Sequence, residues 1–308
     1  MEKIYDMLVI GGGPGGYTAA LYAARAGLSV AVLEKLSAGG QMALTAQIDN
    51  YPGFEEGIDG FTLGEKMQQQ AERFGAVTEL VEVTALRLDS PVKAAETSEG
   101  TFYGKTVVLS TGAGPKLLGL PKERELTGKG VNYCAACDGM FYKGKTVVVV
   151  GGGNTAAADA LALSRIAKKV IVVHRRDTLR ATKVYHQPLA HAPNVEFVWN
   201  STVTKLLDNG KLNGVQVSNL QTGEEHVIDC DGLFVSIGRT PATWLVKDQL
   251  VLDDAGYVMA GETTAASMPG VFAVGDVRTK ALRQIVTAVA DGAAAAHFAE
   301  EYLAGHAQ

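Results

Sequence analysis

A glycine-rich pattern that occurs twice constrains the fold more than any other feature of the sequence. Residues 9–34 read VIGGGPGGYTAALYAARAGLSVAVLE, and residues 149–174 read VVGGGNTAAADALALSRIAKKVIVVH. Each copy has a β-branched run, a glycine turn, a stretch rich in Ala and Leu, and a second β-branched run, which predicts a strand, a helix and a strand. Such a unit lets the backbone approach a pyrophosphate at the positive end of the helix. We therefore predict an α/β fold with two Rossmann-like dinucleotide-binding domains.

Both copies fit the dinucleotide fingerprint G-x-G-x-x-G/A. The matching positions are Gly11, Gly13 and Gly16 in the first copy and Gly151, Gly153 and Ala156 in the second. The alternative is a Gly-rich turn that binds nothing, since glycine turns between a strand and a helix are common. Two copies in register, each with a strand and a helix of the right length, favour dinucleotide binding.

The segments after the two copies predict how each domain is completed. Residues 77–109 and 195–237 contain short alternating strands and turn signals, so each domain is predicted to carry a small antiparallel meander in a three-layer ββα arrangement. Residues 271–303 contain one strand and one helix, which is too little to fold alone. This C-terminal piece is therefore predicted to dock on an earlier sheet.

The sequence thus predicts a second domain inserted into the first. We place the inserted domain at residues 116–244, and the first domain at residues 1–115 and 245–308. Gly and Pro residues at 114–115, 119–121 and 238–241 are predicted hinges between them. The charged run KERELTGK at 122–129 is predicted to be a solvated loop.

The end of the second strand in each copy indicates which dinucleotide it binds. In the first copy this position is Glu34, an acid that suits a ribose with a free 2′-OH. In the second copy it is His174, followed by Arg175 and Arg176, with Arg180 one turn later. Guanidinium groups suit a 2′-phosphate, although a basic solvated turn is the alternative. We predict NADPH for the second copy and a different dinucleotide, FAD, for the first.

The overall composition excludes several classes of protein. The 308 residues carry a net charge of −5 and are 47% hydrophobic, so neither a nucleic-acid partner nor a membrane surface is indicated. No apolar run approaches the roughly 20 residues that span a bilayer, and the N-terminus does not resemble a signal peptide. Three cysteines do not form a disulfide framework, so a reducing, cytoplasmic location is predicted.

Two of those cysteines, Cys134 and Cys137, lie in the stretch YCAACDG at residues 133–139. A structural zinc site needs four ligands, and the remaining Cys230 and the scattered histidines do not supply them, so no metal is predicted. A structural disulfide across two residues would close too small a loop to stabilise much. Beside a flavin site and an NADPH site, the spacing favours a dithiol/disulfide redox couple. Cys230 is predicted to be a buried apolar side chain.

The chain resembles the bacterial-type thioredoxin reductases of low molecular weight over nearly its full length. Besides the two fingerprints, the matching stretches are residues 39–42, 50–53, 111–113, 133–139, 174–180, 275–277 and 283–285. One departure is Ala136, where the family often has Thr. It removes no reacting group.

The resemblance implies two sets of cofactor-binding residues. Those for FAD, in the first domain, are Gly11, Gly13, Pro14, Gly16, Glu34, Lys35, Gly40, Gln41, Asn50, Thr111, Gly112, Gly275, Asp276, Arg283, Gln284 and Ile285. Those for NADPH, in the inserted domain, are Gly151, Gly153, Asn154, Thr155, His174, Arg175, Arg176 and Arg180.

The resemblance also implies the activity, a transfer of electrons from NADPH through FAD and the cysteine pair to thioredoxin. Cys137 corresponds to the cysteine nearest the flavin, Cys134 to the thiol that attacks thioredoxin, and Asp138 to the acid/base. A homodimer, and rotation of the inserted domain at its two junctions, are implied as well.

Two alternatives remain at the level of the sequence. One is a related flavoprotein with another electron donor or acceptor, either a ferredoxin-linked reductase or an oxidase of small dithiols. Such relatives tend to lack the cationic cluster, which is intact here. The other is a non-catalytic NADPH-binding sensor, which has no use for a dithiol next to an acid.

Overall fold

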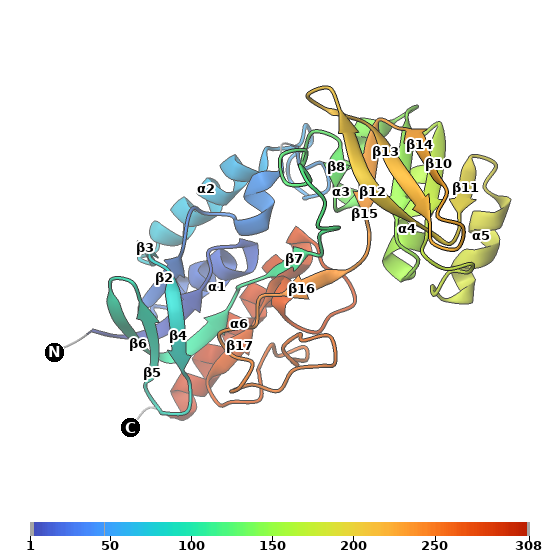
Figure 1. Cartoon of the computed structure of the whole chain (residues 1–308). Coiled ribbons are helices and arrows are strands. Elements are labelled where there is room, and N and C mark those ends of the chain that lie inside the picture. The colour runs from blue at the N-terminus through green and yellow to red at the C-terminus, as the bar shows by residue number, and fades with distance from the viewer. Residues whose placement is uncertain (1–2, 46, 307–308) are drawn as a thin grey trace. The chain divides into compact units, whose positions relative to one another are not determined.

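The computed structural model describes residues 3–45 and 47–306, and the chain divides into two compact units (Figure 1). Unit 1 consists of Met1–Gly114 and Thr240–Gln308, and unit 2 consists of Pro115–Arg239. The chain therefore leaves unit 1, forms all of unit 2 and then returns. Each unit contains a parallel sheet and helices, so the predicted α/β class is confirmed.

Unit 1 is built on a seven-stranded sheet in the order β3-β2-β1-β6-β5-β4, with β17 also paired to β6. The strands are β1 (Ile4–Ile10), β2 (Val30–Glu34), β3 (Val77–Leu80), β4 (Val83–Arg87), β5 (Lys93–Thr97), β6 (Gly100–Leu109) and β17 (Val271–Ala273). Strands β1, β2, β3, β6 and β17 pair in parallel, whereas β5 pairs antiparallel with β6 and β4 pairs antiparallel with β5. All of β2 is buried, as is typical of a strand covered on both faces.

The helices of unit 1 bring the C-terminal segment next to the first glycine loop. They are α1 (Pro14–Arg25), α2 (Gly60–Glu72) and α6 (Ile285–Gly305), with the short 3-10 helices η1 (Gly40–Leu44) and η4 (Gly275–Val277). Helix α6 packs against α1 at very short range, since a Cβ at Gly292 would lie 2.3 Å from the carbonyl oxygen of Gly15. The predicted docking of the C-terminal piece is confirmed, through both this helix and β17.

Unit 2 contains two separate sheets. The parallel sheet has the order β11-β10-β9-β15-β8, and the antiparallel sheet has the order β12-β13-β14. The strands are β8 (Val131–Asn132), β9 (Thr146–Val150), β10 (Lys169–Val173), β11 (Val195–Val198), β12 (Ser201–Asp208), β13 (Leu212–Asn219), β14 (Glu225–Asp229) and β15 (Gly232–Val235). The helices are α3 (Ala135–Asp138), η2 (Gly139–Tyr142), α4 (Asn154–Ser164), η3 (Lys183–Tyr185) and α5 (His186–His191).

The two connections between the units form a two-stranded sheet of their own. It consists of β7 (Ala113–Pro115) and β16 (Arg239–Pro241). Gly238, just before β16, has a φ of +111°, a conformation that glycine adopts readily and other residues rarely do. The chain therefore requires glycine at this junction.

The structure corrects three expectations. Strand β3, predicted as part of an antiparallel meander, pairs in parallel with β2, because it follows the helix α2 that carries the chain across the sheet. Strands β5 and β14 were not predicted, since their segments are short and rich in charged residues. The run at 122–129 is not a solvated loop throughout, because the hydrogen-bonded Glu123 is 2% exposed and the apolar Leu126 is 4% exposed. Within residues 3–45 and 47–306, no helix has the length and apolar character to cross a membrane.

The close approach of α6 and α1 leads to a prediction about stability. Gly292→Ala should lower the free energy of unfolding of unit 1 by about 1–3 kcal/mol, because the added methyl group meets backbone atoms that cannot move aside. The matched control is Gly305→Ala at the end of the same helix, where a Cβ would meet no atom within 4 Å. Urea unfolding of the two variants checks this, and equal midpoints would contradict it.

Candidate active site

The first glycine loop leaves the beginning of α1 open. A Cβ at Gly16 would lie 2.2 Å from the carbonyl oxygen of Gly11, which itself has a φ of +101°. Helix α1 starts after Gly13 with Pro14 in its first turn, and no side chain caps its N-terminus. Free N–H groups at the positive end of a helix fit a pyrophosphate. This geometry agrees with the requirements of a dinucleotide.

Glu34, at the end of β2, is hydrogen-bonded to the same glycine loop. Its carboxylate is buried and accepts hydrogen bonds from the backbone N–H of Gly12 at 2.6 Å and of Leu36 at 3.0 Å. The neighbouring Lys35 is exposed and pairs with Glu82 at 2.6 Å. Of these two expected cofactor residues, only Glu34 contacts the glycine loop.

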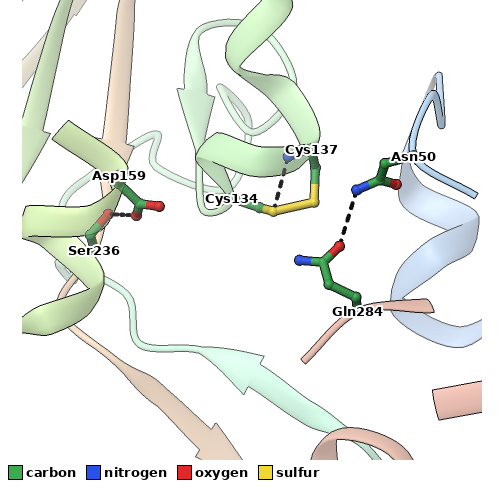
Figure 2. The surroundings of a disulfide bond; sticks show 6 residues. All are labelled: Asn50, Cys134, Cys137, Asp159, Ser236 and Gln284. Atoms are coloured by element: carbon green, nitrogen blue, oxygen red, sulfur yellow. Dashed lines mark hydrogen bonds between the residues drawn. A yellow bond between two sulfur atoms is a disulfide. The ribbon is translucent and has the colours of Figure 1, made fainter. Parts of the chain in front are cut away.

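Three further segments of unit 1 carry expected FAD residues. Gly40 and Gln41 begin η1, which is joined to the loop because Gly39 N–H donates to the Gly12 carbonyl at 2.8 Å. Asn50 Nδ2 donates to Gln284 Oε1 at 3.1 Å, as Figure 2 shows. Gln284 in turn caps α6, which begins at the expected Ile285. The fold thus brings together two residues that lie far apart in the sequence.

The turn at Thr111 and Gly112 lies at the end of unit 1 before the first connection. Thr111 Oγ1 donates to the carbonyl of Ala242 at 2.8 Å, and the Gly112 carbonyl accepts from the N–H of Ala242 at 2.9 Å. Both expected residues therefore join the outgoing chain to the returning chain within this unit.

An ion-pair cluster that the sequence analysis missed fixes the turn at Gly275 and Asp276. Asp291, on α6, accepts from Gly275 N–H at 2.8 Å, from Arg278 Nη1 at 2.8 Å and from Lys280 Nζ at 2.7 Å. The expected Arg283 lies with its guanidinium carbon 3.9 Å from the centre of the Tyr257 ring. The sequence marks Asp291 only as a charged residue within an Ala-rich helix and does not indicate its partners.

The second glycine loop, in unit 2, repeats the open arrangement. A Cβ at Gly151 would lie 2.4 Å from the Ser236 carbonyl oxygen, whereas one at Gly153 would meet no atom within 4 Å. Helix α4 begins at Asn154 without a side-chain cap, because its N-cap residue is Gly153. Asn154 Oδ1 accepts from Thr182 N–H at 2.8 Å. The N-terminal N–H groups, including that of Thr155, thus fit a second pyrophosphate.

The basic cluster after β10 separates into two parts. Arg175, Arg176 and Arg180 are exposed, whereas His174 is 4% exposed. The His174 ring lies directly against Gly152, at which a Cβ would meet it at 2.2 Å. Burial, followed by the charges of the three arginines, lowers the pKa of His174. The arginines are therefore the groups of this cluster that face solvent as cations.

The cysteine pair lies at the start of α3. Cys134 and Cys137 form a disulfide, with 5.3 Å between their Cα atoms. Cys134 Sγ accepts a hydrogen bond from Cys137 N–H at 3.2 Å (Figure 2). The next residue, Asp138, has its pKa raised to about 6 by burial. A carboxyl group with such a pKa exchanges protons near neutral pH.

A second half-buried carboxylate in unit 2 was not predicted. Asp159, on α4, accepts from Ser236 Oγ at 2.5 Å (Figure 2). Burial raises the pKa of Asp159, and the Ser236 hydrogen bond and the charge of Arg239 partly oppose this. The contact joins α4 to the end of β15. Asp159, the one acid on α4, could not be told apart from a surface residue by pattern alone.

The third cysteine, Cys230, is 5% exposed, so its predicted burial is confirmed. Burial and the neighbouring Asp231 and Asp229 raise the pKa of its thiol to about 12. Such a thiol is unreactive, since the thiolate is the nucleophile. Among the described residues, no group of three or more His, Cys, Asp or Glu side chains could hold a metal ion.

Comparison with known proteins identifies the class. Residues 5–292 match the pyridine nucleotide-disulphide oxidoreductase family. The thioredoxin reductase of Peptoclostridium acidaminophilum is 42% identical over 98% of this chain and 98% of its own. A bifunctional thioredoxin reductase/thioredoxin from Mycobacterium leprae is 44% identical over 99% of this chain and 67% of its own. The crystal structure of thioredoxin reductase from Streptococcus pyogenes matches with a TM-score of 0.90 at 41% identity, covering 99% of this chain and 100% of that one.

The chain therefore belongs to the pyridine nucleotide-disulphide oxidoreductases. Within this family it belongs to the bacterial-type thioredoxin reductases, so the resemblance inferred from the sequence is confirmed.

The raised pKa of Asp138 predicts how stability depends on pH. The native protein keeps this proton up to about pH 6, whereas the unfolded chain releases it near the ordinary value of 3.8. The unfolded state thus binds fewer protons between these values, and stability must fall as the pH rises from about 4 to about 6. Urea midpoints of the parent should show this fall relative to Asp138→Asn.

The exposed Asp248 provides the control, because Asp248→Asn should follow the parent at every pH. A constant difference between the parent and Asp138→Asn from pH 4 to pH 8 would show that Asp138 does not titrate in this range.

Proposed function

We propose that this protein is an NADPH-dependent flavoprotein disulfide reductase whose acceptor is a thioredoxin. The observation that carries the proposal is the Cys134–Cys137 disulfide, with Asp138 beside it, in a chain that has two uncapped glycine-loop helices. A relative in which reductase and thioredoxin form one chain supports the choice of acceptor.

FAD is assigned to unit 1 and NADPH to unit 2. When bound, FAD accepts a hydride from NADPH and supplies two electrons to a disulfide. The open start of α1 suits the FAD pyrophosphate, and Glu34 suits the adenosine ribose. Asn50 and Gln284 are assigned to the flavin ring system. The start of α4 suits the NADPH pyrophosphate.

The 2′-phosphate of NADPH is assigned to the exposed arginines Arg175, Arg176 and Arg180. Guanidinium groups bind a phosphate with two parallel hydrogen bonds and keep their charge at any physiological pH. His174 supports the loop at Gly152 instead, because its ring is buried.

The residues of the chain then carry out the exchange with thioredoxin. In the reduced pair, the Cys134 thiolate attacks one sulfur of the thioredoxin disulfide, and a mixed disulfide forms as the old bond breaks. Cys137 attacks Cys134 in turn, which restores the disulfide and releases thioredoxin as a dithiol. Asp138 accepts and donates the thiol protons, for which its pKa of about 6 is suited.

The assembly and location belong to the same proposal. We assign a homodimer and a cytoplasmic location, a reducing compartment in which a close cysteine pair is more often catalytic than structural. Sedimentation at micromolar concentration tests the first assignment, since a monomer would reject it.

The central test replaces each cysteine. Cys134→Ser and Cys137→Ser should each lower NADPH-dependent reduction of thioredoxin by about 10³-fold or more, because both sulfurs take part in the exchange. NADPH should still bleach the flavin absorbance in both variants, since that step needs no cysteine. Cys230→Ala is the control and should keep its turnover. Thioredoxin reduction that survives either serine variant would reject the proposal.

A second test concerns the choice of cofactor. Arg175→Ala and Arg176→Ala should each raise the KM for NADPH by about 10- to 100-fold, the effect of losing a charged hydrogen bond. The KM for NADH should not change, because NADH has no 2′-phosphate. Arg165→Ala, which removes an exposed arginine after α4, is the control. A similar loss with both cofactors would instead indicate general damage to the site.

A further inference from the structure

Glu123 is a buried acid within a run of charged residues. Its neighbours Lys122, Arg124 and Glu125 are exposed, whereas Glu123 is 2% exposed. Lys122 has a φ of +64°, in the left-handed region that residues other than glycine seldom adopt. This turn directs the next side chain inward. A strained backbone that buries a carboxylate requires an explanation in terms of what the carboxylate holds.

The carboxylate of Glu123 accepts hydrogen bonds from four donors, all of them uncharged. Oε1 accepts from Leu118 N–H at 2.9 Å and from the Tyr133 hydroxyl at 3.0 Å. Oε2 accepts from Gly119 N–H at 2.8 Å and from Leu120 N–H at 3.3 Å. Three consecutive backbone N–H groups and one phenol are thus gathered on a single side chain.

The two ends of this network lie at different parts of unit 2. Leu118 to Leu120 follow the point where the chain enters unit 2 at Pro115. Tyr133 immediately precedes Cys134 of the disulfide. Burial and the Glu123 carboxylate raise the pKa of Tyr133 to about 12, so its hydroxyl remains a donor at physiological pH. The hydrogen bond between Tyr133 and Glu123 therefore persists at physiological pH.

We propose that Glu123 is a positioning residue for the redox disulfide, acting through Tyr133 to hold the backbone at Cys134 where its sulfur meets Cys137. The aromatic ring of Tyr133 packs on the same apolar cluster as Leu118 and Leu120. Packing alone does not fix the position of the ring on that surface, because apolar contacts have no preferred direction. The hydrogen bond from the hydroxyl to Glu123 is directional and fixes the position of the ring. The inference rests on the proposed function only in that the pair cycles between disulfide and dithiol.

The test measures the equilibrium between the cysteine pair and glutathione, using the full chain with its flavin and without NADPH or thioredoxin. Tyr133→Phe keeps the ring and removes the donor, and Glu123→Gln keeps the size and removes the charge. In each variant the equilibrium constant for closing the disulfide should fall by about threefold to tenfold, the effect of one lost hydrogen bond on two thiols that must meet.

The double variant Glu123→Gln/Tyr133→Phe separates positioning from general support. Because Glu123 acts through Tyr133, the double variant should lose no more than the larger single loss. Glu125→Gln, an exposed neighbour, is the matched control and should leave the equilibrium unchanged. In the reduced form of each single variant, the rate at which iodoacetamide alkylates Cys134 should differ from that of the parent, whereas the buried Cys230 should stay unreactive.

Equilibria within twofold of the parent in both single variants would overturn the inference. So would a loss that only accompanies a lower unfolding midpoint and that is additive in the double variant, because Glu123 would then merely support residues 118–120. If the variants behave as expected but the parent does not reduce thioredoxin, the proposed function fails and the positioning role stands.

Discussion

The rest of the structure depends on the close approach of backbone to backbone at the two glycine loops. A Cβ at Gly16 would lie 2.2 Å from one carbonyl oxygen, and a Cβ at Gly151 would lie 2.4 Å from another. These contacts fix where each strand ends and each helix begins, and they leave the first N–H groups of α1 and α4 uncapped. Everything assigned to cofactor binding follows from those two open helix ends, because a phosphate can reach them and no side chain competes.

The two loops also show why a repeated unit can bind different cofactors. The residue at the end of the second strand contacts the middle glycine in both copies, with Glu34 accepting from Gly12 N–H and the His174 ring lying against Gly152. That position supports the loop in both copies. In the second copy the support comes from a neutral ring, and the cations lie further along at Arg175 and beyond.

The pattern that repeats along the chain was sufficient to predict the α/β class. The burial of Cys230 was predicted from its being a lone cysteine. Local pattern failed where a contact joins distant segments. Nothing in the local sequence ADG at residues 290–292 marks Asp291 as the partner of Gly275 N–H, because the two become neighbours only after α6 packs on the sheet. Glu123 was placed in a solvated loop because its neighbours are charged, and only its four donors show otherwise. The cofactor roles of individual residues stay predictions, since no bound group tests them.

Unit 2 holds one buried and two half-buried carboxylates, Glu123, Asp138 and Asp159, and none of the described contacts pairs Glu123 or Asp138 with a cation. A buried carboxylate that relies on neutral donors stabilises less than apolar packing of the same volume would. Such groups are retained where direction matters, since a hydrogen bond has an angle and a hydrophobic contact does not. Glu123 accepts from the hydroxyl of Tyr133, the residue before Cys134. Asp138 follows Cys137, and Asp159 joins α4 to the end of β15. A pair of sulfurs that must form and break a bond at every turnover needs its backbone returned to one geometry, and the hydrogen bond from Tyr133, next to Cys134, to Glu123 is a directional contact of this kind.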